Sequence, residues 1–497
     1  MTSLLNGLKS ATNYGLTENG GVKHNTSGSA LIDLFGLGGA YRSRSESDCI
    51  SLFLAALKED REHAMKCLFY LRDIRGGQGE RRFFRVCMRY LAMNEPEVVV
   101  KNIDNFAYYG RWDDLYCLFG TPCEQAALAA IKEQLAYDVT AKTPSLLAKW
   151  MKSENASSKE GKALAEVTRR YLKMSSKQYR KTLSYLRKKI NIVERLMSEN
   201  RWNEIEFDKL PSKAGIKYRK AFERNELIKQ QYQNFARDKN TKVNAGTLYP
   251  YEVVKEAVGV RSRSVEDTQR LMVNKYWENL TDFFNGATLN ALCVVDVSGS
   301  MTWTPLSPGS QCYPIHVAIS MGLYTAERAK GPFANHFITF SNRPSLVEVK
   351  GHDIVSKVDN IYRADVGGST NLEATFDLIL NTAVTNRLTQ EDLPETIIIV
   401  SDMEINDARG YYSSHVSSTA TLMENMRVKW ANWGYKMPKL VYWNCQARND
   451  TILDIHPDVT LVSGNSPVIY QQILTGKSGL DLVLDKLDSE RYNRVRY

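Results

Sequence analysis

The chain has 497 residues, a formal net charge of +9, 43% hydrophobic residues and 24% charged residues. This length is too great for one hydrophobic core, so two or more domains are expected, and the composition is typical of a folded globular protein. No apolar run approaches the roughly 18–20 residues that span a bilayer, and the N-terminus lacks the apolar core of a secretory signal. We therefore expect neither a membrane-spanning nor a secreted protein.

The eight cysteines are scattered along the chain without a C-x-x-C pair, and several lie in apolar patterns. Reduced, buried thiols of this kind are typical of cytoplasmic proteins, so a cytoplasmic location is expected. The seven histidines are also scattered, which argues against a zinc site.

The N-terminal part predicts an arm followed by helices. Residues 1–47 are rich in Gly, Ser, Thr and Asn and predict an extended arm with a short apolar piece at 30–37. From residue 48, apolar side chains recur at helical spacing. Helices are predicted over 61–73, 80–93, 96–106, 113–119, 123–138 and 144–153. Short helices joined by short turns favour a helical-repeat, HEAT-like solenoid over 48–285, although no strict sequence period is present.

A glycine-rich stretch, Arg72 to Arg82, precedes one of these predicted helices. Such a loop can hold a phosphate on its backbone amides. However, it lacks the Gly-Lys-Ser/Thr of a nucleotide P-loop, and no strand precedes it. A tight turn between helices is therefore the preferred interpretation, with nucleotide binding as the alternative.

A basic segment follows between residues 169 and 190, where nine Lys or Arg residues occur without Asp or Glu. Leucines at helical spacing predict an amphipathic helix, and Tyr171, Tyr179 and Tyr185 are interleaved with the charges. Positive charge with aromatic platforms is what single-stranded nucleic acid binding uses, but a solvated helix face with core tyrosines fits equally well. The predicted RNA contacts are Lys173, Arg180, Lys181, Arg187, Lys188 and Lys189. A second basic cluster lies at 213–224 on another predicted helix.

The C-terminal part, 286–497, predicts an α/β domain. Strands are predicted at 290–296, 334–340, 396–401, 438–443 and 459–463, and helices at 315–329, 371–384, 417–430, 467–475 and 479–488. This alternation predicts a doubly wound, mostly parallel sheet covered by helices on both faces.

Oxygen-bearing side chains follow two of these strands. Asp296, Ser298 and Ser300 come at the end of one apolar strand, and Asp402 ends another. Thr370 lies near the start of a predicted helix. Because the carboxyl ends of parallel strands share one edge, these side chains are expected to meet there. Hard oxygens suit Mg²⁺, with Mn²⁺ or Ca²⁺ as alternatives, although a D-x-S-x-S motif alone also describes an ordinary turn.

This ordered set resembles the von Willebrand factor A domain and its metal-ion-dependent adhesion site. The resemblance implies that Asp296, Ser298, Ser300, Thr370 and Asp402 hold the metal, directly or through water. It also implies one open coordination position, which an acidic residue of a protein partner fills.

The whole chain resembles the Ro autoantigen with its TROVE module, and more closely a family of Ro-like proteins found in phages, plants and fungi. The stretches that carry the resemblance include Arg72–Arg81, Gly110–Asp114, Leu146–Trp150, Tyr179–Leu183, Tyr218–Phe222 and Asp296–Ser300. The Ro resemblance implies a ring of helical repeats closed by the von Willebrand factor A domain, with single-stranded RNA ends in the hole and structured RNA on the basic outside.

Two functions are therefore predicted. The first is a non-catalytic RNA-binding scaffold of the Ro type, and the alternative is a metal-dependent protein-interaction or assembly module without RNA. An enzyme is not expected, because the hydroxyl-rich site offers no evident base or nucleophile pair in sequence.

Overall fold

The computed structural model describes residues 13–17, 22–190, 192–307, 309–341, 343–363, 370–405 and 422–497. The chain forms two compact units. The sheet unit combines Met1–Ala64 with Leu248–Asp488, and the helical unit combines Met65–Thr247 with Ser489–Tyr497. These units divide the chain at different residues from the predicted ranges 1–47, 48–285 and 286–497. The expected combination of a mostly helical region with a C-terminal domain of mainly parallel strands is confirmed.

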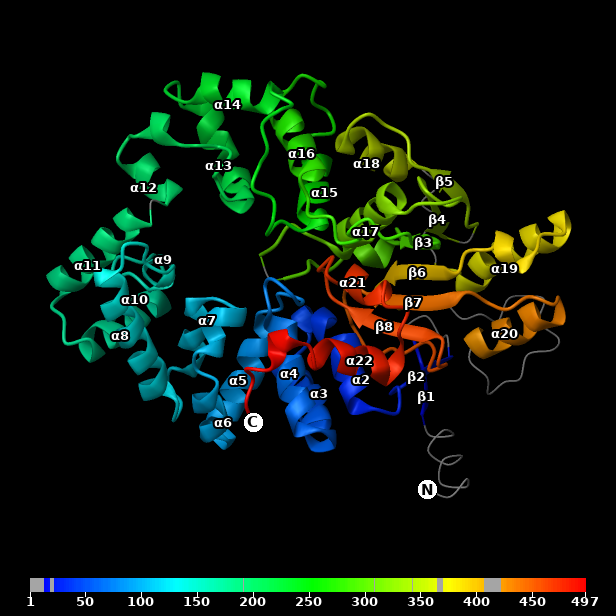
Figure 1. Ribbon diagram of the computed structural model, residues 1–497, viewed down its shortest axis with the longest axis horizontal. Coiled ribbons are helices and arrows are strands. Elements are labelled where there is room, and N and C mark those ends of the chain that lie inside the picture. The colour runs from blue at the N-terminus through cyan, green and yellow to red at the C-terminus, as the bar shows by residue number, and fades with distance from the viewer. Residues whose placement is uncertain are drawn as a thin grey trace. The chain divides into compact units, whose positions relative to one another are not determined.

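The sheet unit is built on six strands in the order β5-β4-β3-β6-β7-β8 (Figure 1). The strands are β3 (Ala291–Asp296), β4 (His336–Phe340), β5 (Leu346–Glu348), β6 (Thr396–Ser401), β7 (Lys439–Asn444) and β8 (Val459–Ser463). All neighbours pair in parallel except β4 and β5, which are antiparallel. The five predicted strands are confirmed, whereas β5 was not predicted because its three residues, Leu-Val-Glu, are too few to leave a strand pattern.

Both faces of the sheet are covered, because successive strand residues point to opposite sides. On one face, Leu292 and Val294 of β3 pack with Phe376 of α19 and Trp430 of α20 in a buried cluster. On the other face, α17 approaches β3 so closely that a Cβ on Gly322 would lie 2.4 Å from Val295. The central strands are therefore apolar throughout, which is why they were predictable as buried strands.

The helices of the sheet unit come from both ends of the chain. They are α2 (Ala30–Leu37), α3 (Glu46–Glu59), α15 (Pro250–Gly259), α16 (Thr268–Glu278), α17 (Pro314–Arg328), α18 (Ile354–Arg363), α19 (Leu372–Asn386), α20 (Leu422–Asn432), α21 (Ile469–Ile473) and α22 (Gly479–Leu487), with 3₁₀ turns at Gly38–Ser43, Gly299–Thr302 and Gln390–Asp392. A short hairpin of β1 (Tyr14–Leu16) and β2 (Val22–His24) precedes them.

Residues 30–43, which the sequence placed in an extended arm, pack against the sheet instead. Helix α2 buries Leu34 and Phe35 and lies along the edge strand β8. A Cβ on Gly36 would lie 3.0 Å from the Leu461 Cβ, and one on Gly39 would lie 2.5 Å from the Ser463 carbonyl. The glycines that predicted a loop are thus needed for close packing, which covers an otherwise open sheet edge.

The helical unit consists of short helices and 3₁₀ turns. They are α4 (Arg61–Arg72), α5 (Arg82–Asn94), α6 (Pro96–Lys101), α7 (Asn105–Tyr109), η2 (Trp112–Leu118), α8 (Glu124–Thr140), α9 (Leu147–Trp150), α10 (Lys159–Tyr171), α11 (Ser176–Lys189), α12 (Val193–Ser198), η3 (Trp202–Glu204), α13 (Ser212–Arg224), α14 (Lys229–Arg237) and η6 (Glu490–Tyr492). Most agree with the predicted ranges to within a few residues. The HEAT-like repeat interpretation stays a prediction.

The glycine-rich loop between α4 and α5 is a tight turn, as preferred. Its amides at Gln78, Gly79 and Glu80 donate to the carbonyls of Tyr70, Asp73 and Leu71. A Cβ on Gly77 would lie only 1.9 Å from the Tyr70 carbonyl oxygen. The amides of Gln78, Gly79 and Glu80 are therefore bonded to the backbone and are not available to a phosphate.

The segment 489–497 is bound into the helical unit by a buried carboxylate. Asp73 accepts hydrogen bonds from the Arg491 guanidinium, one of them 2.6 Å long, and from the Tyr492 hydroxyl at 3.1 Å. Tyr109 donates its hydroxyl to the Arg491 carbonyl at 2.5 Å, and Asn102 accepts from the Arg496 amide at 2.9 Å. This segment therefore belongs to the core of the helical unit.

No helix in the described ranges is both long enough and apolar enough to cross a membrane.

All eight cysteines lie in the described ranges as thiols, and six of them are buried. The prediction of reduced, mostly buried thiols is confirmed.

Replacing Arg491 with Met should destabilise the helical unit by about 3 kcal/mol, because it leaves the buried Asp73 carboxylate without its cation. Hydrogen–deuterium exchange of α4, α5 and α7 measures the effect directly. Arg496→Met is the matched control, since Arg496 lies in the same segment, is exposed, and its guanidinium donates only to backbone carbonyls. Equal exchange in the two variants would contradict this account.

Candidate metal centre

The predicted metal ligands lie at the carboxyl edge of the sheet. In the parallel pairing of β3 with β6, Val295 stands opposite Val400, so Asp296 comes next to Ser401 and Asp402 follows directly. Apolar residues fill both strands up to this edge, and the first polar side chains occur where the strands end. The local sequence therefore delivers both carboxylates to one place.

Hydrogen bonds orient the Asp296 carboxylate and the two serine hydroxyls. Oδ1 of Asp296 accepts from the Ser298 amide at 2.9 Å, and Oδ2 accepts from the Ser401 hydroxyl at 2.5 Å. The Ser298 and Ser300 hydroxyls lie 3.1 Å apart. Asp296 is completely buried and Ser300 is partly exposed, so the cluster opens to solvent on the serine side.

Asp402 and Thr370 are held by the loop that follows β6. Oδ1 of Asp402 accepts from the Glu404 amide at 3.3 Å, across Met403, which has a positive φ of 63°. The Thr370 hydroxyl, just before α19, donates to the Glu404 carbonyl at 3.2 Å. Ser300 also donates to Asp402. All five predicted side chains thus belong to one network of hydrogen bonds at this edge.

Two negatively charged carboxylates, those of Asp296 and Asp402, are electrostatically unfavourable when they are buried close together. Burial raises the pKa of Asp296 above its ordinary value. Burial, and then the nearby Asp296 carboxylate, raise the pKa of Asp402 to about 7, while the Arg448 guanidinium acts in the opposite direction. A further positive charge at this site would therefore be stabilised.

The donor set suits a divalent cation with hard character. It offers two carboxylates and three hydroxyls, which are the oxygen ligands that Mg²⁺ and Ca²⁺ prefer. Within the described part of the chain, no group of three or more His, Cys, Asp and Glu residues is placed to hold a metal. Serine and threonine hydroxyls are the further side-chain oxygens that this cluster offers, and metal binding here stays a prediction.

Arg448 is a component of this site that sequence reasoning missed. Its Nη2 lies 3.2 Å from Oδ2 of Asp402, which is only 2% exposed. Arg448 follows β7 by four residues, so the rule that placed the carboxylates at the carboxyl edge also indicates this loop.

The N-terminal segment holds the loop that carries Arg448. The Ala447 amide donates to the Ala40 carbonyl at 3.1 Å, and the Arg44 guanidinium donates to the Arg448 carbonyl at 2.8 Å. Lys23 donates to the Asp450 carbonyl at 2.8 Å. Residues predicted to form a separate arm therefore help to position a charge at the metal site.

An exposed aromatic residue borders the site. Trp303 follows the 3₁₀ turn that contains Ser300 and is 71% exposed. Its indole ring lies near Gly299, where an added Cβ would be 3.9 Å from Cζ2. A large apolar surface beside an oxygen-rich cluster is a feature of contact surfaces rather than of a protein interior.

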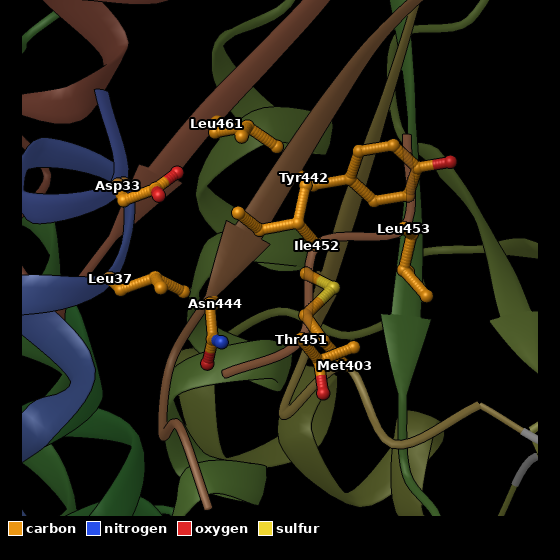
Figure 2. Close-up of a pocket in the computed structure, with 10 residues that line it drawn as sticks. Asp33, Leu37, Met403, Tyr442, Asn444, Thr451, Ile452, Leu453 and Leu461 are labelled. Carbon is orange, nitrogen blue, oxygen red and sulfur yellow. The ribbon is translucent and has the colours of Figure 1, made fainter. Parts of the chain in front are cut away.

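A small cavity beneath the site is lined by Leu37 of α2 and Met403 of the loop after β6 (Figure 2). Its volume is about 10 Å³, which accommodates no more than a single water molecule. The cavity is therefore not a substrate pocket.

The predicted RNA contacts lie in the helical unit and fall into two groups. Lys173, Arg180, Lys181 and Lys188 are exposed. Arg187 instead donates to Ala148 and Met151 carbonyls and to the Ser153 hydroxyl at 2.8–3.1 Å. Lys189 donates to the carbonyls that end α8, at 2.9 and 3.2 Å. These two side chains hold neighbouring segments together, so their positive charges are committed to the fold.

Two domain-family models match parts of the chain. The family described as "Domain of unknown function (DUF2828)" matches residues 17–135 and 126–285, which together span more than half of the chain. The family described as "Domain of unknown function (DUF7788)" matches residues 290–493. Neither description names an activity.

A curated relative and a solved structure are also similar. The chain is 32% identical over 511 residues to "Uncharacterized protein L728" of Acanthamoeba polyphaga mimivirus, covering 94% of this chain and 85% of that protein. It is similar to the crystal structure of the Deinococcus radiodurans RO (RSR) protein, with 15% identity, a TM-score of 0.39, and coverage of 94% of this chain and 100% of that one. So low a TM-score carries no inference about function.

Affinity for Mn²⁺ at this site should rise about tenfold between pH 6 and pH 8, because a carboxyl with a pKa near 7 must lose its proton before it can bind a cation. Isothermal titration calorimetry at several pH values measures the change. Arg448→Met should move the rise to higher pH, since the guanidinium lowers the pKa of Asp402. Binding independent of pH over this range would contradict the assignment.

Proposed function

The chain belongs to the family described as "Domain of unknown function (DUF2828)", and we propose that it is a non-catalytic scaffold that binds single-stranded or structured RNA through a basic surface of its helical unit. Its sheet unit is proposed to be a von Willebrand factor A domain that binds a divalent cation, with Mg²⁺ as the first candidate. The protein is proposed to act in the cytoplasm.

The exposed face of α11 is the observation that carries this proposal. Lys177, Arg180, Lys181 and Lys188 are exposed on a helix that contains no Asp or Glu, and Tyr185 is exposed among them. Arg180 has one weak acidic neighbour, Glu154, at 3.9 Å. A helix face with this charge and an aromatic platform suits a phosphate backbone with unstacked bases.

A second helix supports the same interpretation. Lys213, Lys217, Lys220 and Arg224 are exposed on α13. Their spacing of four, three and four residues places them along one side of that helix. Two basic helix faces in one unit favour an extended polyanion as the ligand over a small anion.

The sheet unit supports a second candidate function, a metal-dependent contact with a protein partner. The oxygen cluster opens to solvent near Ser300, beside the exposed Trp303. A bound cation with an open position would take a carboxylate of the partner, and Trp303 would contact apolar residues around it. The two functions are compatible, because the residues involved belong to different units.

A non-catalytic role is favoured by the surroundings of the serine hydroxyls. Ser298 and Ser300 hydrogen-bond to each other, and Ser300 also donates to Asp402. Within the described part of this site, neither hydroxyl has a histidine partner that would activate it as a nucleophile.

Replacing Lys173, which precedes α11, and Arg180, Lys181 and Lys188 of α11 with Glu gives a charge-reversal variant, here called the α11 variant. It should lose RNA binding without unfolding the helical unit, because all four side chains are exposed. Fluorescence anisotropy with a labelled single-stranded oligoribonucleotide measures the affinity. For the unmodified chain, log affinity should fall with log salt with a slope of about −2.8 if these residues neutralise four phosphates.

The control for this experiment changes net charge by the same amount elsewhere. Lys58, Lys330, Lys350 and Lys436 are exposed in the sheet unit, and their replacement with Glu should leave RNA binding largely unchanged. Equal affinity of the α11 variant and the unmodified chain would exclude this surface. Arg187 and Lys189 are left intact, because their replacement would confuse loss of binding with loss of structure.

The second candidate predicts that a protein partner captured in Mg²⁺ is released by EDTA and is not captured by the Asp296→Ala variant. RNA binding should survive both treatments, because Asp296 lies in the sheet unit. Asp481→Ala, an exposed substitution in the same unit, is the control. Capture that persists in EDTA would exclude a cation-mediated contact.

A further inference from the structure

Three stretches of the helical unit that carry the family resemblance come together around two aspartates. They are the glycine-rich loop with the start of α5, the turn Arg111–Asp114, and the end of α9 at Trp150. None of them belongs to the basic face of α11 or to the metal centre. The two functions proposed above therefore do not account for this cluster of charged residues.

Asp114 is fully paired by arginines. Arg72 donates from Nε at 2.8 Å, and its Nη2 lies 2.7 Å from the same oxygen, Oδ2. Arg85 donates from Nε to Oδ1 at 2.7 Å. Asp114 and Arg72 are both almost completely buried. This pairing is structural, because it joins α4, α5 and η2.

Asp113 is shared among three further guanidinium contacts. Arg111 donates to both of its oxygens at 2.9 Å, and Nη2 of Arg85 lies 3.1 Å from Oδ2. Arg81 is only loosely paired, with Nη1 4.0 Å from the same oxygen and half of its side chain exposed. The single negative charge of Asp113 is therefore shared by the guanidinium groups of three arginines.

Positive charge exceeds negative charge in this cluster. Arg72, Arg81, Arg85 and Arg111 contribute four charges, and Asp113 and Asp114 offset two, which leaves two positive charges unmatched. Burial, and then the guanidinium groups of Arg85 and Arg111, lower the pKa of Arg81. The arginines thus repel one another, and an anion would relieve that repulsion.

The partly exposed arginines are also held in position. The Arg111 guanidinium carbon lies 3.9 Å from the centre of the Trp150 ring, a stacked geometry that fixes the plane of its donors. Arg85 is anchored to both aspartates. Because the amides of Gln78, Gly79 and Glu80 are bonded to backbone carbonyls, the arginine side chains are the main donors that this cluster offers to an anion.

We propose that Arg81, Arg85 and Arg111 form a phosphate-binding site in the helical unit. Two unmatched positive charges correspond to a phosphate monoester dianion. The loosely paired Arg81 can offer its planar guanidinium to two phosphate oxygens, whereas Arg85 and Arg111 already use Nε and Nη2 on the aspartates and add mainly charge. The ligand is either a small phosphate compound or the terminal phosphate of a nucleic acid chain. The site is independent of the proposed α11 surface, and its test does not depend on that surface.

Isothermal titration calorimetry of the full chain in EDTA tests the site without interference from cations. The probes are inorganic phosphate and a short single-stranded oligonucleotide with or without a 5′-phosphate. Arg81→Gln should weaken binding of phosphate about tenfold, because it removes a charged hydrogen-bond donor from an otherwise intact site. Arg75→Gln is the matched control, since Arg75 is exposed in the same loop and donates to the Tyr108 carbonyl.

The outcomes separate the two ligand sources. Preference for the 5′-phosphorylated oligonucleotide over both other probes identifies a nucleic acid end, whereas phosphate binding unchanged by an attached chain identifies a small phosphate compound. The α11 charge-reversal variant should keep its affinity for inorganic phosphate even if it loses RNA. No binding of any phosphate probe, or equal binding by the Arg81→Gln variant with its thermal stability unchanged, overturns the proposal.

Discussion

The meeting of two buried carboxylates at the carboxyl edge of β3 and β6 is the constraint on which the sheet unit depends. Asp296 and Asp402 are placed there by the register of two apolar strands, and the low-polarity surroundings make their joint ionisation unfavourable. Hydrogen bonds from hydroxyls and backbone amides, together with the charge of Arg448, partly offset the cost of ionising both carboxylates. A bound divalent cation would complete that compensation, which is why the most strained electrostatics of this unit coincide with its best candidate site.

The helical unit contains clusters of positive rather than negative charge. Some of its basic side chains form hydrogen bonds or ion pairs that stabilise the fold. Arg187 and Lys189 satisfy carbonyl groups at helix ends, and Arg72 neutralises a buried aspartate. Others remain on the surface of α11 and α13 or are crowded around Asp113. The functional interest lies in those whose charge the fold does not need, since only they can meet a ligand without weakening the structure.

Predictions from the sequence agree with the structure where a short stretch of residues has a clear apolar pattern. The five predicted strands are apolar runs buried on both faces, so their position did not depend on distant residues. The three-residue strand β5 and the packing of α2 on β8 escaped prediction, because neither leaves a periodic pattern. Glycines at 36 and 39 resembled loop residues, although their role is to let two elements approach closely. Exposed and structural arginines look identical in sequence, so Arg187 was grouped with the exposed residues that are predicted to contact RNA.

The sequence by itself determined the order of the five longer strands, the strand ends that carry Asp296 and Asp402, and the basic character of α11, because each depends on residues close together in the chain. Only the tertiary structure decided that Arg448 reaches Asp402, that Ala40 and Arg44 hold the loop carrying it, and that Arg81, Arg85 and Arg111 share one aspartate. Most of these contacts join residues that lie between 28 and 404 positions apart, and the Arg111–Asp113 pair depends on side-chain geometry. Their energies come from burial and charge pairing in three dimensions, which no local pattern of residues records.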